Sequence, residues 1–224
     1  MAYSKGVNPT IAALWRYPVK SMLGERCEEL HIDVRGAAGD RLYAVRDAEG
    51  KLGSGKNSGR FRRLEGLFTF QAAGVPPTVT FPDGRSLGAD DPTVHAALSA
   101  ALRAPVTLAA EKEIAHHDAE PLHLITTGSL ARLGTDERRF RPNLVIRTEA
   151  DEAGWVGRIL QVGEATLKLV RRTERCVMIT MAQSELGDQP GLLRRLGGEA
   201  PLFGVYAEVL VPGRIKRGDE VHLQ

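Results

Sequence analysis

Short apolar segments that alternate with glycine and proline turns constrain the fold of this chain more than any other feature. Segments of this kind recur at Ile11–Trp15, Cys27–Asp33, Arg41–Arg46, Phe68–Ala72, Thr78–Phe81, Leu144–Arg147, Arg158–Gln161, Ala165–Val170, Arg175–Thr180, Phe203–Val211 and Glu220–Leu223. The 24 glycines and 12 prolines supply the turns between them. Many short strands favour a mainly β, barrel-like architecture over a doubly wound parallel sheet.

Only a few short helices are expected. The clearest one follows an acidic cap and Pro92, and it places Val94, Leu98 and Leu102 on one apolar stripe. Two more short helices are predicted over residues 127–133 and 188–196.

The helix that follows Pro92 closes a first domain. Residues 105–117 are predicted to form a strand and then a connection, which puts the domain boundary near residue 110. We therefore predict a smaller β-rich domain over residues 1–110 and a second β domain over residues 111–224.

Composition excludes several classes of partner. The net charge of +2 and the sequence pI near 8.6 do not favour nucleic-acid binding, which requires clustered basic residues. The first ten residues lack the pattern of a secretory leader, and no apolar run approaches the ~18 to 20 residues that span a bilayer. The two cysteines, Cys27 and Cys176, lie far apart and do not indicate a disulfide framework. We expect a cytoplasmic protein that binds neither membrane nor nucleic acid.

Two segments in the last third of the chain carry candidate chemistry, namely RRFRPN at Arg138–Asn143 and ERCVM at Glu174–Met178. The second segment places Cys176 directly after Arg175. A cysteine beside an arginine is a plausible thiolate, and a thiolate is a soft metal ligand. The alternative is a buried strand cysteine that acts as a small hydrophobic residue, which is how Cys27 is interpreted.

With PLFGVY at Pro201–Tyr206 and PGRIKRGD at Pro212–Asp219, these segments resemble the MOSC domain family. Near the start, YPVKS at Tyr17–Ser21 and GDR at Gly39–Arg41 resemble the β-rich domain that precedes MOSC in the amidoxime-reducing components and their bacterial relatives. The resemblance spans nearly the whole chain. It implies a MOSC-type β-barrel preceded by a smaller β-rich N-terminal domain, and it implies the molybdenum cofactor, a pterin that bears a dithiolene and a phosphate.

The resemblance also implies roles for single residues. Cys176 would ligate molybdenum and serve as the catalytic residue. The residues implied in cofactor binding are Lys20, Ser21, Arg41, Lys56, Asp118, Arg141, Asn143, Arg175 and Tyr206. An ammonium, a hydroxyl and a forked guanidinium suit a phosphate. Each also has an ordinary alternative, such as a solvated lysine beside a turn or a half-buried tyrosine of a barrel strand.

Some positions depart from the family pattern or stay ambiguous. Ala119 and Glu120 replace a hydroxyl pair that contacts the cofactor in the reductases, whereas Asp118 is retained. The glycine-rich basic segment over residues 54–63 either lies in water or holds an anion. His116 and His117 lack a metal-ligand spacing, and we interpret them as a solvated loop. In a regular strand Arg175 and Cys176 point to opposite faces, so the backbone must turn or bulge there if both contact the cofactor.

The resemblance implies an oxidoreductase that reduces N-hydroxylated small molecules such as hydroxylamines, amidoximes or N-hydroxylated bases. Its electrons would come from a separate ferredoxin, flavoprotein or cytochrome b5-like donor, because two cysteines cannot hold a cluster that needs four. A second hypothesis is a carrier of molybdenum cofactor or sulfur in which Cys176 bears a persulfide. A third is a MOSC-like scaffold without cofactor.

Overall fold

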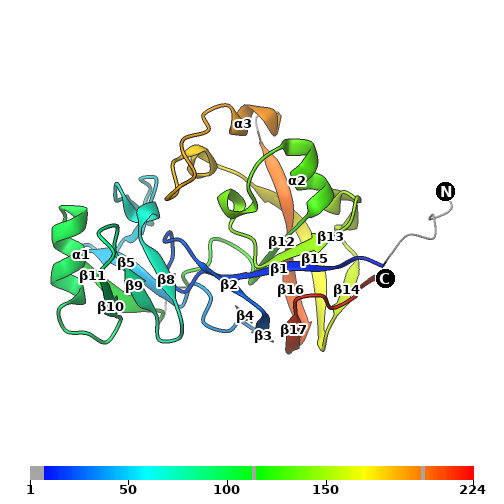
Figure 1. Cartoon of the computed structure of the whole chain (residues 1–224), viewed down its shortest axis with the longest axis horizontal. Helices are drawn as coiled ribbons and strands as arrows, with labels where there is room; N and C mark the ends of the chain where they lie inside the picture. The colour runs from blue at the N-terminus through cyan, green and yellow to red at the C-terminus, as the bar shows by residue number, and fades with distance from the viewer. Residues whose placement is uncertain (1–7, 113–114, 198–199) are drawn as a thin grey trace.

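The computed structural model describes residues 8–112, 115–197 and 200–224 (Figure 1). Residues 1–7, on which much of the expected absence of a leader rests, lie outside the described residues, as do 113 and 114 of the predicted connection over 105–117. Within the described ranges the chain is mainly strand, as predicted, with three α-helices and several single turns of 3-10 helix. No helix in these ranges is both long enough and apolar enough to cross a membrane.

An eight-stranded sheet forms the larger part of the molecule. From edge to edge it runs through β18 (Val221–Leu223), β14 (Ile159–Val162), β15 (Ala165–Glu174), β16 (Leu202–Val211), β12 (Leu122–Thr126), β13 (Leu144–Arg147), β1 (Thr10–Arg16) and β2 (Glu25–Cys27). In this sheet β12 and β13 pair in parallel and the other neighbours are antiparallel. The strand β12, which the sequence analysis missed, therefore lies at the centre of the sheet.

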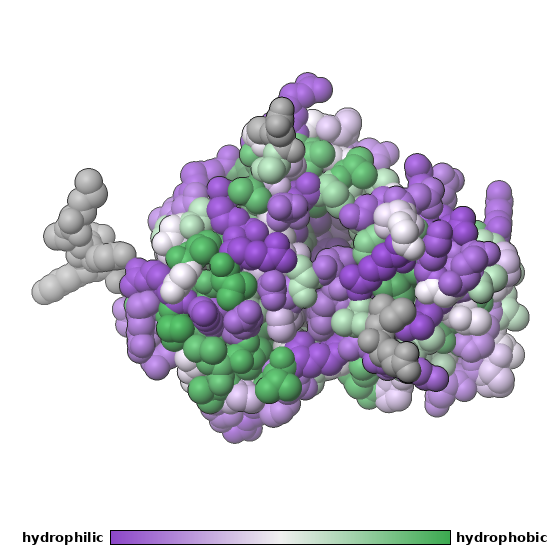
Figure 2. Space-filling model, turned by 180° about the vertical axis from the view of Figure 1, so that it is seen from behind, coloured by the Kyte–Doolittle hydropathy of each residue, from purple (hydrophilic) through white to green (hydrophobic). Residues whose placement is uncertain are grey.

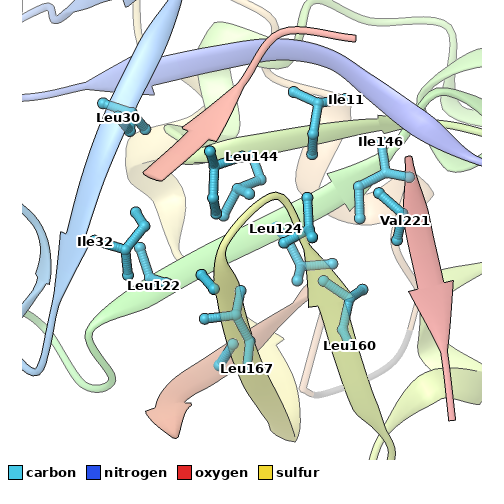
Figure 3. Packing of buried hydrophobic residues seen from close by; sticks show 14 of the residues in the cluster. Ile11, Leu30, Ile32, Leu122, Leu124, Leu144, Ile146, Leu160, Leu167 and Val221 are labelled. Carbon is cyan, nitrogen blue, oxygen red and sulfur yellow. The ribbon is translucent and has the colours of Figure 1, made fainter. Parts of the chain in front are cut away.

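One apolar cluster explains why these segments form strands. Alternate residues of each strand turn inward, so that side chains such as Ile11, Leu124, Leu144 and Leu160 point toward one another (Figure 3). All four are essentially inaccessible to solvent. Burial of aliphatic side chains of this size contributes about 1.5 to 3 kcal/mol each, so this cluster is the main stabilising feature of the larger part.

The sheet curls but does not close along a full ladder. Its edge strands β18 and β2 are not paired with each other in the described residues. Instead β1 reaches the start of β18 through the isolated bridge between Thr10 and Glu220, supported by a hydrogen bond of 2.9 Å from Ile11 N to Asp219 O. The predicted barrel is therefore a curled sheet whose far ends meet at one short contact.

A smaller β-rich part lies beside this sheet (Figure 1). It contains a four-stranded sheet, in the order β11 (Val106–Ala110), β5 (Tyr43–Asp47), β6 (Leu52–Ser54) and β7 (Phe61–Arg63). It also contains a three-stranded sheet, in the order β10 (Ser86–Gly88), β9 (Thr78–Thr80) and β8 (Gln71–Ala73). Helix α1 (Val94–Leu102) buries Val94, Leu98 and Leu102 in the second apolar cluster, as its sequence stripe predicted.

Strands from the start of the chain join the larger part. The N-terminal strand β1 pairs with β13 in the large sheet, and β17 (Gly213–Lys216) pairs with β3 (Glu29–Asp33), which also pairs with β4 (Gly36–Ala37). The predicted single strand over 27–33 is therefore two strands, β2 and β3, with different partners. The boundary near residue 110 stays a prediction, and the crossing strands fix the two parts against each other.

Helices and single turns cover one end of the large sheet. These are α2 (Thr127–Leu133), α3 (Leu192–Arg195) and the 3-10 turns η2 (Glu137–Phe140), η3 (Glu152–Trp155) and η4 (Val177–Thr180). A further 3-10 turn, η1 (Leu67–Thr69), lies in the smaller part, where Leu67 belongs to the second apolar cluster. Helix α3 is shorter than the predicted span of 188–196. The predicted strand over 175–180 is wrong, because β15 ends at Glu174 and η4 then buries Ile179 in a third apolar cluster against Phe140 and Phe203.

Candidate functional site

A cavity of about 380 Å³ lies where the two parts meet, and all ten predicted site residues line it. The residues come from the smaller part (Lys20, Ser21, Arg41, Lys56) and from the larger part (Asp118, Arg141, Asn143, Arg175, Cys176, Tyr206). The view in Figure 2 shows the molecule hollowed near its middle, with hydrophilic side chains around the hollow. Lys20 and Tyr206, which lie 186 positions apart in sequence, thus line the same cavity.

Lys20 is buried in the cavity wall, with 4% of its side chain exposed. Its Nζ donates hydrogen bonds to His116 O (2.8 Å) and to Asp118 Oδ1 (2.7 Å). Burial lowers the pKa of Lys20 to about 8, against the opposing effect of the Asp118 carboxylate. The next residue, Ser21, has a left-handed backbone (φ 65°) and donates from Oγ to Gly53 O at 3.1 Å.

Three cations surround the ring of Phe61 in the same wall. The Nζ atoms of Lys20 and Lys56 lie 5.2 and 5.3 Å from the ring centroid, and the guanidinium carbon of Arg60 lies 5.4 Å from it. Arg60 also donates to the carbonyls of Ala115 and His117. Cations gather on an aromatic face because the ring quadrupole attracts them, so this wall holds like charges together and favours an anion.

Arg41 and Arg141 stack on Tyr17, with guanidinium carbons 5.1 and 4.3 Å from the ring centroid. Arg41 pairs with the fully buried Asp40. Burial opposes both charges, yet the pair holds the pKa of Asp40 well below its usual range and raises that of Arg41. Arg141 has no such carboxylate partner in the described residues, and burial lowers its pKa to about 10. Its Nη2 is buried without a hydrogen-bond partner in those residues.

Backbone strain marks the same residues. Among the described non-glycine residues, five have a left-handed backbone, and three of them, Ser21, Arg41 and Arg141, line the cavity. A left-handed conformation costs a residue with a Cβ about 1 to 2 kcal/mol. Strain of this kind persists where the surrounding structure holds it and clusters at functional sites.

Asn143 supports the wall from behind. Its Oδ1 accepts from His123 N at 3.2 Å and its Nδ2 donates to Trp15 O at 3.3 Å. The amide thus joins β12 to β1 while its residue lines the cavity.

Arg175 and Cys176 both reach the cavity because the chain leaves β15 at Glu174, which supplies the turn that the sequence required. Arg175 N donates to Pro201 O at 2.8 Å. The guanidinium donates from Nε to Phe203 O (2.8 Å) and from Nη1 to Phe140 O (3.2 Å). Burial lowers the pKa of Arg175 to about 10. Cys176 is a partly exposed free thiol beside this fixed cation.

Several lining residues were missed by the sequence analysis. His123 accepts from Arg175 Nη2 through Nε2, and burial together with that charge keeps the imidazole pKa well below its usual value, so the ring is neutral. Arg139 is buried and donates to Ile179 O (3.3 Å), Met181 O (3.1 Å) and Gly187 O, which holds the segment after Cys176. Arg139 lies inside the RRFRPN motif, but no sequence signal pointed to His123.

One further expectation is corrected. His116 is fully buried rather than solvated, and it contacts Arg41 O through Nδ1 (3.1 Å) and Arg46 Nη2 through Nε2 (2.9 Å). Thr126 and Ser129, which lie near the substituted segment in sequence, bind the buried Glu152 instead of lining the cavity.

The donor set suits an anionic group held by one thiol better than a bare metal ion. Eight basic side chains line the cavity against three acidic ones. No group of three or more His, Cys, Asp and Glu side chains in the described ranges could hold a metal ion. The fold and cavity define a β protein in two interlocked parts, with a cationic cavity and a single thiol between them.

The chain belongs to the MOSC domain family. The model of the MOSC domain matches residues 94–222, and that of the MOSC N-terminal beta barrel domain matches residues 8–90. The chain is 25% identical to mitochondrial amidoxime-reducing component 1 of Mus musculus over 280 residues, which covers 96% of this chain and 82% of that protein. It is 32% identical to the Homo sapiens protein of the same name over 134 residues, covering 50% of this chain and 39% of that one.

Solved structures support the fold. The YUAD protein from Bacillus subtilis superposes with a TM-score of 0.54 at 14% sequence identity, covering 97% of this chain and 96% of that one. At this identity the likeness concerns the fold alone.

Proposed function

We propose that this protein is a molybdenum-cofactor-dependent oxidoreductase that reduces N-hydroxylated compounds, such as hydroxylamines, amidoximes or N-hydroxylated bases. The observation that carries the proposal is the convergence of all ten expected residues on one cavity. The similarity to amidoxime-reducing components supports the same reaction class.

The cavity fits such a cofactor on chemical grounds. The dithiolene and phosphate are anionic, and the cavity has an excess of basic residues. The buried Arg141 Nη2, which lacks a partner in the described residues, is a donor for an anionic or carbonyl oxygen. Lys20, Ser21, Arg41, Lys56 and Arg141 would hold the phosphate and pterin, and the Cys176 thiolate would be the metal ligand.

When bound, the cofactor supplies a two-electron redox centre, and the chain supplies the surroundings. Arg175, fixed by two carbonyls and His123, places positive charge beside Cys176, where it would balance the negative charge of the bound group. Tyr206 and Asp118 complete the wall on the open side. Asp118 is 61% exposed, so it meets incoming solvent or substrate while it pairs with Lys20.

The substituted segment does not place an unpaired carboxylate against the cofactor. Glu120 pairs with Arg171, Oε1 to Nε at 3.1 Å, so its charge is matched. The hydroxyls lost at Ala119 and Glu120 remove two contacts, and the other expected residues remain in the wall.

The electrons would come from a separate ferredoxin, flavoprotein or cytochrome b5-like donor, because Cys27 and Cys176 cannot supply the four ligands of a cluster. The cytoplasmic location, the small-molecule substrate and the absence of nucleic-acid and membrane partners stay predictions from the sequence.

The test uses protein produced in a host that makes the cofactor. Cys176→Ala is expected to lose bound molybdenum and the reduction of benzamidoxime by a chemically reduced viologen, whereas Cys27→Ala, the matched thiol deletion outside the cavity, keeps both. A Cys176→Ala protein that retains metal and activity would overturn the mechanism. Persulfide on Cys176 without tightly bound molybdenum would favour the carrier, a role open to a free thiol in a cavity. If the protein carries neither molybdenum nor a persulfide, the hypothesis that remains is a MOSC-like scaffold without cofactor.

A further inference from the structure

An ion pair at the cavity rim is not used by the proposed cofactor contacts. Glu120, two residues before β12, binds Arg171 of β15 at 3.1 Å. The two side chains are 26% and 49% exposed, and both line the cavity, so the pair lies at its opening. The guanidinium carbon of Arg171 also lies 5.3 Å from the centroid of the Tyr206 ring.

A β-bulge puts Arg171 over Tyr206. Along β15 and β16, Leu169 lies opposite Ala207, so an unbroken ladder would place Val170 opposite Tyr206. The register shifts between Leu169 and Arg171, and Arg171 takes that place instead. The bulge therefore exchanges an aliphatic neighbour of Tyr206 for a guanidinium.

The other neighbour of Tyr206 is His123, which lies opposite it on β12. The two rings meet edge to face, with centroids 5.7 Å apart. Because Nε2 of this neutral histidine accepts from Arg175, the ring is fixed on one side by the same arginine that adjoins Cys176. Tyr206 thus lies between a buried His123 that is hydrogen-bonded to Arg175 and an Arg171 whose side chain is half exposed.

We propose that Glu120 and Arg171 form a gate at the cavity rim, which covers Tyr206 and limits access to Cys176 by the width of the entering molecule. A molecule that contacts the exposed face of Tyr206 must displace the guanidinium and break the ion pair. Both contacts are weak at a partly exposed site, so an entering molecule needs little free energy to separate them. The gate would favour slender N-hydroxylated compounds over wide ones, and this choice of substrate class rests on the proposed function.

Alkylation of Cys176 tests the gate without any cofactor. In cofactor-free protein carrying Cys27→Ala, the rate constants for two uncharged reagents of the same reaction type, N-ethylmaleimide and N-(1-pyrenyl)maleimide, are measured, and the ratio of bulky to small reagent is formed. Glu120→Gln is expected to raise this ratio about two- to fivefold, the effect that one partly exposed ion pair supplies. Arg171→Ala removes the covering side chain itself and is expected to raise the ratio further.

Arg172→Ala is the matched control. Arg172 is the next residue of β15, its Nη2 lies 3.5 Å from Leu202 O, and it does not line the cavity. Its ratio is expected to equal that of the parent protein. Equal ratios in the Glu120→Gln, Arg171→Ala and Arg172→Ala proteins would overturn the gate.

A second measurement separates the gate from the proposed function. In cofactor-loaded protein, kcat/KM for benzamidoxime is compared with that for an amidoxime bearing a bulky ring substituent. Glu120→Gln should favour the bulky compound by the same factor as in alkylation. If no N-hydroxylated compound is reduced while the alkylation ratios shift, the proposed function fails and the gate stands. If both compounds are reduced with unchanged selectivity and unchanged alkylation ratios, the gate fails and the proposed function stands.

Discussion

The burial of Lys20 predicts that the protein becomes more stable as the pH rises, which is the opposite of the usual effect of a lysine that gains a partner on folding. The side chain of Lys20 is buried, and burial lowers its pKa from the 10.5 of a solvated lysine to about 8 in the folded protein. Between these two pH values the unfolded chain binds more protons at this site than the folded protein does. Stability must therefore rise with pH in this window, because deprotonation removes a charge whose burial is costly.

The magnitude follows from the two pKa values. From pH 8 to pH 10 the contribution of Lys20 to the free energy of unfolding increases by about 2 kcal/mol, since a full proton difference corresponds to about 1.4 kcal/mol per pH unit. Lys20→Met removes the charge, keeps the buried stem and abolishes this contribution. The window ends near pH 10 because burial raises the pKa of Tyr17, which gives the opposite slope above that pH.

The assay is urea unfolding of cofactor-free parent and Lys20→Met proteins at pH 8, 9 and 10. The difference between the two unfolding free energies cancels other groups that titrate in this range, such as Cys27, whose pKa burial raises. It should move in favour of the parent protein by about 2 kcal/mol. Lys168→Met, at an exposed lysine of β15, is the control and should show no such change. A difference that is flat or falls with pH would refute the assigned burial of a charged Lys20.

Two further predictions concern stability. Gly204 has φ 79°, and a Cβ there would overlap His123 Nε2, whereas Gly157 has φ 89° and open space around it. Gly204→Ala should therefore cost more in thermal unfolding than Gly157→Ala, which carries only the strain of about 1 to 2 kcal/mol; equal costs would contradict the close packing at His123. Asp40→Asn leaves Arg41 buried without its partner, and it should lower the free energy of unfolding at pH 7 by about 3 to 5 kcal/mol. The pKa of Asp40 is depressed in the folded state, so the difference from the parent protein should shrink as the pH falls below about 4, and a difference independent of pH would refute it.

The family resemblance of a few short motifs named residues that lie far apart in the sequence and that the structure brings to one cavity. Lys20, Arg41, Arg141 and Cys176 could be named from the sequence because each lies in a segment that carries this resemblance. His123 was missed because it lies in a central strand between leucines, where a histidine is ordinarily satisfied by the core. Its ring is hydrogen-bonded by Arg175, which lies 52 residues away, and no local pattern around His123 indicates that partner.

The errors in secondary structure also have physical causes. The run over residues 175–180 is rich in β-branched residues and was predicted as a strand, but burial of Ile179 against Phe140 determined a 3-10 turn. The strand β12 is buried at every residue, so it shows no alternation to detect. The sequence around His116 suggested a solvated loop. In the structure its ring contacts the Arg46 guanidinium of β5 and the carbonyl of Arg41, in the turn before that strand.

The pairing of β1 and β3 with strands that come much later in the chain sets the order in which the cavity is completed during synthesis. The strand β1 is made before its partner β13, which follows some 130 residues later, and β3 is made before its partner β17. A nascent chain that ends after the smaller part still lacks Cys176, Tyr206 and the arginines that the larger part contributes to the cavity. A group that contacts both parts of the cavity therefore finds its site complete only after β16 has been synthesised.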